Sequence, residues 1–184
     1  MISRTGPAIL TASAAGVALS LALLQTSAAA TAPASAQEFV TKAAQGGLAE
    51  VELSKMAQTR AHAAAVKSFA ARMVHDHTQA NSALQAIAVR KGLSVPTDTD
   101  AEHRALIGTL SQETGEQFDK DYVAAMTKDH DAAIGLFEGE SSTTGPDAER
   151  RAFAATTLPT LKMHRQMVTG LGDPATRSGS VRGE

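Results

Sequence analysis

The chain has 184 residues, of which 43% are hydrophobic but only 3% aromatic, and it contains no cysteine. The lack of cysteine excludes disulfides, thiol chemistry and lipid attachment through a thiol. The formal net charge of −2 lacks the basic excess of a nucleic-acid-binding protein, so we expect no nucleic-acid partner. Abundant alanine with few aromatic residues favours close-packed helices over a β-sheet.

The N-terminal residues 1–36 have the pattern of a secretory signal peptide. Arg4 precedes an apolar run over residues 8–24, whose roughly 17 residues are at the lower limit for a membrane span. Two A-x-A sites follow, ending at Ala30 and Ala36. We expect cleavage after Ala36, because the helical pattern begins directly after it. The alternative is an uncleaved N-terminal anchor.

Cleavage there removes Arg4 and no acid, which leaves about 148 residues with 16 basic and 19 acidic side chains. This length suffices for one domain with its own core, which we expect over residues 37–171. We expect the protein to be a monomer or a weak homo-oligomer. Residues 172–184, rich in glycine, serine and arginine, are expected to form a disordered tail. We therefore expect an exported protein, periplasmic or extracellular, with no stable membrane insertion after cleavage.

Four long segments carry apolar residues at helical spacing, and no segment has a strand pattern. The long helices are expected at about residues 38–58, 64–91, 116–139 and 147–170, with a short helix at about 101–113. Pro159 lies inside the last helix and is expected to kink it, because proline removes a backbone donor and clashes with the preceding turn. The pattern predicts an all-α protein, an antiparallel four-helix bundle with a short extra helix between the second and third long helices.

The stretch Met-x-x-Asp-His occurs twice, ending at His77 and at His130. At about 100° per residue on a helical wheel, both histidines fall on the apolar face of their helix. Asp76 and Asp129 fall at the edge of that face. Each copy therefore turns one histidine into the bundle, and its methionine is expected to fill core space.

Other polar residues also fall on inward faces, and the rise of 1.5 Å per residue estimates their heights. The estimate assumes that the long helices run up and down in chain order, with the first and last turns at one end. Glu50, His77 and His130 then lie at about 16, 20 and 14 Å from that end, so these three are expected to meet. Asp119 and His164 lie at about 30 and 25 Å, which predicts a second polar pair.

Two imidazole nitrogens and a carboxylate oxygen suit zinc, copper or iron, so Glu50, His77 and His130 are candidate metal ligands with an open fourth position. Asp76 and Asp129 are expected to orient a ring through its other nitrogen. The alternative is that the histidines only form hydrogen bonds with carboxylates and fix the register of the helices. The remaining histidines are expected at the solvated surface: His62, His75 and His103.

Four blocks of the sequence carry a family resemblance. They are Ala43-Ala44-Gln45-Gly46-Gly47-Leu48-Ala49-Glu50, Phe69-Ala70 with Asp76-His77, Phe118-Asp119 with His130, and Leu158-Pro159 with His164. With these blocks the chain resembles the exported bacterial family known as domain of unknown function 4142, from about Gln37 to Leu171. The resemblance implies a ferritin-like four-helix bundle and no particular activity.

The chain departs from ferritin-like di-iron enzymes, which carry Glu-x-x-His on two of their helices. That motif does not occur here, and the adjacent Asp76 and His77 diverge by about 100°, so they cannot chelate one ion together. No nucleophile triad or phosphate-binding loop stands out either, so no catalytic residue is assigned. Three hypotheses stay open: a binding or envelope-stress protein whose His/acid cluster is structural or holds a metal, a metal-dependent oxidoreductase, and a helical protein-interaction module.

Overall fold

The computed structural model describes residue 1, residues 35–145 and residues 147–172. The expected signal peptide and tail lie almost entirely outside these residues and stay predictions. No helix within the described ranges is both long and apolar enough to cross a membrane.

Four long helices and one short helix make up the described chain. They are α1 (Ala36–Arg60), α2 (Ala64–Arg90), α3 (Ala101–Leu110), α4 (Gly115–Ser141) and α5 (Ala148–Gly172). The all-α class and the short helix between the second and third long helices are thus confirmed, with every boundary within three residues of its predicted place. α5 continues through Pro159.

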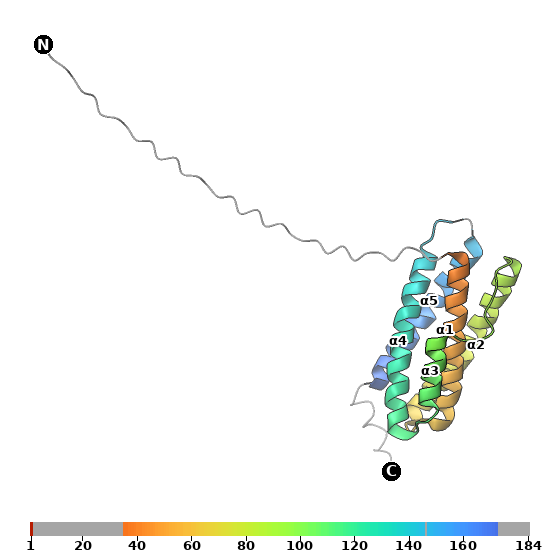
Figure 1. The fold of residues 1–184 in the computed structure, drawn as a ribbon, viewed down its shortest axis with the longest axis vertical. Helices are drawn as coiled ribbons and strands as arrows, with labels where there is room; N and C mark the ends of the chain where they lie inside the picture. Colours follow the sequence, from red (N-terminus) through yellow and green to blue (C-terminus); the bar gives the residue numbers. More distant parts are fainter. Residues whose placement is uncertain (2–34, 146, 173–184) are drawn as a thin grey trace. The chain divides into compact units, whose positions relative to one another are not determined.

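The connection between α2 and α4 runs the length of the bundle (Figure 1). α3, within this connection, packs beside α1, and α4 begins next to the α1–α2 turn, where a backbone bridge joins Ala61 to Gly115. The direction assumed for the height estimate is therefore wrong: the α4–α5 turn lies at the opposite end from the α1–α2 turn. A single long crossover is a feature of ferritin-like bundles, but the ferritin-like assignment itself stays a prediction.

Asp119, in the first turns of α4, caps the start of α2. The N-cap residue Ala63 has no side chain that could do so, and the backbone amides of His62 and Ala63 instead donate to Oδ1 and Oδ2 of Asp119, at 2.9 and 2.8 Å. Free amides at a helix start need such acceptors. Asp119 therefore fastens α4 to the α1–α2 turn.

The apolar core consists of two clusters separated along the helix axes. One contains Phe69, Met73, Tyr122, Met126 and Val168, and the other contains Phe39, Leu84, Phe137, Phe153 and Leu161. Met73 and Met126 fill core space, as predicted. On every long helix, one buried polar side chain falls in the sequence between residues of the two clusters: Glu50, His77, His130 and His164.

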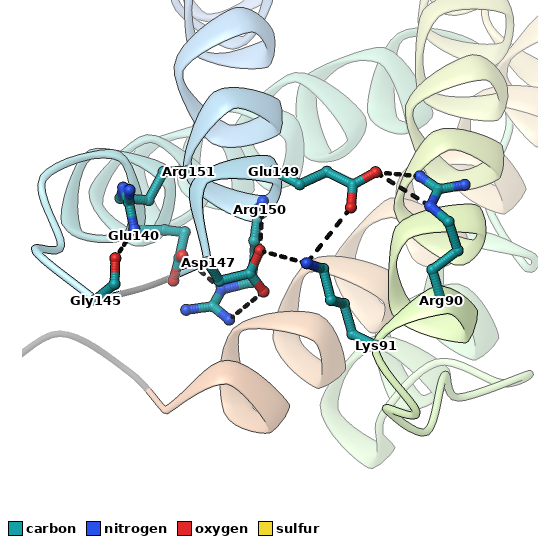
Figure 2. Close-up of polar contacts among 8 residues, drawn as sticks. All are labelled: Arg90, Lys91, Glu140, Gly145, Asp147, Glu149, Arg150 and Arg151. Atoms are coloured by element: carbon teal, nitrogen blue, oxygen red, sulfur yellow. Dashed lines mark hydrogen bonds and ion pairs between the residues drawn. The ribbon is translucent and has the colours of Figure 1, made fainter.

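A second polar cluster lies at the α4–α5 end (Figure 2). Arg150 donates from Nε to Oε1 of Glu140, a side chain that is only 2% exposed. Nζ of Lys91, the residue directly after α2, lies 3.3 Å from Oδ1 of Asp147. The cluster therefore joins the α4–α5 connection to the end of α2.

Candidate metal centre

A polar layer crosses the middle of the bundle, with one side chain from each long helix. Glu50, His77, His130 and His164 are 3%, 5%, 0% and 0% exposed. Ring nitrogens of the three histidines lie within 4.8 Å of one another, and the centroids of the rings are 5.3–5.5 Å apart. The structure thus brings together Glu50, His77 and His130, as the sequence predicts, and adds His164.

Two of the three histidine rings have one nitrogen within hydrogen-bonding distance of a carboxylate. Nδ1 of His77 lies 2.9 Å from Oε2 of Glu50, and Nε2 of His164 lies 2.8 Å from Oδ2 of Asp76. An ionised carboxylate only accepts hydrogen bonds, so each of these nitrogens carries the proton and donates it. The other nitrogen of each neutral ring then bears a lone pair.

The ring of His130 also donates a hydrogen bond from one nitrogen, but its acceptor is a backbone carbonyl. Nδ1 of His130 lies 2.9 Å from the carbonyl oxygen of Met126 and donates to it. The lone pair is therefore on Nε2 of His130, which is buried and has no hydrogen-bond partner. An unpaired buried acceptor is rare in native proteins and costs free energy.

Two ring nitrogens of the layer face each other without a donor between them when the rings are neutral. Nε2 of His77 and Nδ1 of His164 lie 3.3 Å apart, although both bear lone pairs when the rings are neutral. Nε2 of His130 is a third nitrogen of the layer that bears a lone pair, and it has no hydrogen-bond partner. A shared proton could satisfy the first two, whereas a cation among the three could satisfy all of them.

The electrostatics of the layer limit how many protons it holds. Burial alone would raise the pKa of the Glu50 carboxyl, but His77, His130 and His164 outweigh burial and lower that pKa to about 2. Burial lowers the pKa of His130, and burial together with its neighbouring rings lowers the pKa of His164 to about 4. Burial also works against a proton on His77, but Glu50 raises the pKa of that ring. A proton is therefore favoured at His77 alone, which leaves Nε2 of His130 unsatisfied.

Glu50 was expected to be a direct ligand, but its carboxylate faces the outer nitrogens. Oε2 accepts from Nδ1 of His77, and Oε1 lies 3.3 Å from Nδ1 of His130. Because that second N–H is directed at Met126, Oε1 receives no hydrogen bond. In this arrangement Glu50 orients the ring of His77, and His164 supplies the third imidazole of the layer.

The expected pair of Asp119 and His164 is not formed. Both oxygens of Asp119 bind backbone amides at the start of α2, while the nitrogens of His164 contact His77 and Asp76. The reason is the direction of α4. Counted from its true starting end beside the α1–α2 turn, Asp119 lies only about 6 Å along the bundle axis.

The two edge aspartates have different roles. Asp76 orients a ring as expected, although this ring belongs to His164 of α5. Oδ1 of Asp129 instead lies 3.5 Å from Nε2 of His103, whose Nδ1 contacts Asp100 at 2.7 Å. His103 is therefore partly buried, contrary to the expectation of a solvated ring. His62 and His75 are exposed, as expected.

A family model described as a domain of unknown function (DUF4142) matches residues 22–171. The chain belongs to the DUF4142 family. The DUF4142 match spans α1 to α4 and α5 up to Leu171, and hence every residue of the buried layer. No curated protein and no solved structure matches the chain. DUF4142 has no assigned function, so the role of the layer rests on its geometry.

Proposed function

We propose that the DUF4142 bundle binds one divalent transition-metal ion through His77, His130 and His164. The arrangement of the rings carries this proposal: each ring donates a hydrogen bond to the surrounding protein from one nitrogen, which leaves its other nitrogen to bind an ion. The three rings also each bring a nitrogen within 4.8 Å of the others. Imidazole is a good ligand for zinc, copper and iron. Three imidazoles leave one coordination position open, as in three-histidine zinc sites.

The spacing supports a single ion. Nitrogens around a tetrahedral zinc, with bonds of about 2.0–2.1 Å, lie about 3.4 Å apart. His77 and His164 already have this separation at 3.3 Å. One nitrogen from each of the three rings lies within 4.8 Å of the others, so movements of about 1 Å bring them to the spacing of a tetrahedral site.

The surrounding charge also supports a dication. Glu50 and Asp76 each lie one imidazole ring away from the centre and accept a hydrogen bond from that ring. Carboxylates in this position fix the tautomer of a ligating ring and make it a better donor to the metal. Their negative charges attract the positive ion, which reduces the cost of burying it, although Asp76 also pairs with Arg72 at 3.3 Å.

Zinc titration of tag-free protein tests the proposal, with isothermal titration calorimetry for affinity and elemental analysis for stoichiometry. We expect one zinc per chain. His130→Leu should weaken zinc binding by about 100-fold or more, and Asp76→Asn by about 10- to 100-fold. His62→Leu, which removes an exposed histidine, is the matched control and should bind like the wild type. Zinc, copper and iron all failing to bind the wild-type protein would overturn the proposal, as would undiminished binding by His130→Leu.

We also propose that the protein is exported and cleaved upstream of Ser35, not after Ala36. Ser35 is the N-cap of α1: its hydroxyl accepts from the amide of Glu38 at 3.2 Å, and its carbonyl accepts from that of Phe39 at 2.9 Å. Cleavage after Ala30 keeps this cap, whereas cleavage after Ala36 removes it. The mass of the mature protein decides: a chain starting at residue 31 is expected, and one starting at residue 37 contradicts the proposal.

A further inference from the structure

A cavity of about 630 Å³ adjoins the polar layer. Its lining includes buried Glu50 and His77 as well as exposed Glu38 and Asp131, so it extends from the layer to the surface. The first turn of α3 also contributes to its wall. The cavity therefore offers a passage to a site that the four helices otherwise enclose.

Small residues keep this passage open. Gly46 lines the cavity, and a Cβ atom placed there would meet nothing within 4 Å. Glycine inside a helix costs about 1 kcal/mol relative to alanine. Close packing does not account for this cost at Gly46, in contrast to Gly47, where a Cβ would come within 2.1 Å of Asn81 Oδ1. What Gly46 provides is empty space beside the layer.

The cavity also carries two carboxylates with unpaired oxygens. Oε1 of Glu50, at the inner end, and Oδ2 of Asp129 are both buried without a hydrogen-bond partner. Other acids of the lining are already paired with cationic side chains: Glu38 with Lys42, Glu102 with Lys128 and Asp131 with Arg165. Glu50 and Asp129 each have one oxygen beside a histidine, His77 and His103 respectively, and one oxygen that is left without a donor.

We infer that this cavity is the route by which a divalent cation reaches the three-histidine layer, with Asp129 and Glu50 as successive carboxylate contacts. The inference rests on the proposed metal function. Fixed negative charge along a low-dielectric passage raises the local concentration of cations and speeds their association. The carboxylates replace part of the hydration shell of the ion before the imidazoles bind it.

Stopped-flow binding of Co²⁺ to the full protein tests the route, because the visible absorption of Co²⁺ reports its coordination. Asp129→Asn removes the charge at constant shape, and Gly46→Leu fills the passage. Each should slow association about 10-fold, and the equilibrium dissociation constant should stay within about 3-fold because release slows equally. Added salt should slow the wild type more than Asp129→Asn. Gly46→Ala and Asp121→Asn, which lies outside the cavity lining, are the matched controls and should bind at the wild-type rate.

The outcomes separate this inference from the function on which it rests. Wild-type association rates in both Asp129→Asn and Gly46→Leu would overturn the route and leave the metal centre intact. Slower association accompanied by an equal loss of affinity would also overturn it, because Asp129 would then belong to the site itself. A wild-type protein that binds no Co²⁺ would overturn the proposed function first. Thermal melts of each variant establish folding, and if one variant does not fold, the association rate of the other decides.

Discussion

His103 has its ring between two carboxylates of different elements. Nε2 lies 3.5 Å from Asp129 of α4, and Nδ1 lies 2.7 Å from Asp100, the N-cap of α3. The contact with Asp129 raises the pKa of His103 most, and Asp100 adds to it; together they outweigh burial and bring that pKa to about 9. A charged His103 therefore ties the start of α3 to α4.

This ring should make folding pH-dependent. The folded-state pKa of about 9 lies above the ordinary 6.5, so the stabilisation is complete below about pH 6.5 and is lost as the pH rises towards 9. We expect the ring protons of His103 to titrate near pH 9 by NMR. The free energy of unfolding of the wild type, relative to His103→Gln, should fall over the same range. This difference cancels the contribution of other histidines. A midpoint near 6.5 would contradict the arrangement.

At the scale of single residues, the sequence predicts which side chains face inward but not which of them meet. The helical wheel places His77, His130 and His164 correctly, because burial follows the angle around one helix. The partner of His164 depends on the relative direction of two helices, which no wheel contains. Asp76 orients a histidine ring, as expected, but the ring is that of His164 on a different helix.

Among the elements, α2 depends on α4 for its N-terminal cap. Asp119→Ala should lower the free energy of unfolding by about 1–2 kcal/mol, because the amides of His62 and Ala63 lose their acceptors. Asp121→Ala, in the same helix turn, is the control. Its carboxylate accepts from Gln117 in an exposed pair, so the change should stay within about 0.5 kcal/mol. Urea unfolding measures both, and equal losses would refute the capping role.

The α4–α5 end offers a comparison of a buried and an exposed ion pair (Figure 2). Arg150→Ala leaves the buried carboxylate of Glu140 without its partner and should cost about 3 kcal/mol or more. Arg90→Ala breaks the exposed pair with Glu149 and should cost less than about 1 kcal/mol. Similar midpoints in urea for the two variants would show that the buried pair contributes little.

Periodicity predicted the elements well, since apolar spacing marks each long helix. The buried pair of Glu140 and Arg150 was missed, because charged residues near helix ends are normally assigned to the solvated face. No spacing rule indicates that the two would be buried together. Only the packing of the α4–α5 connection against the end of α2 shows this.

For the whole molecule, the long connection between α2 and α4 decides which residues share a layer. The sequence predicted its extra helix but not that it carries the chain back to the α1–α2 end. With α4 starting there, the rise of 1.5 Å per residue places His130 at about 22 Å, beside His77 at about 20 Å. The same arithmetic thus places these two rings at one height once the direction is known.

Because each long helix contributes one side chain to this layer, an ion bound there would couple all four helices. The central claim is that three imidazoles hold this ion. Zinc K-edge X-ray absorption of tag-free protein loaded with one equivalent of zinc counts them directly. The account predicts three imidazole nitrogens at about 2.0–2.1 Å and one further light ligand. A shell of oxygen ligands with at most one imidazole, or an unchanged spectrum from His130→Leu protein, would contradict it.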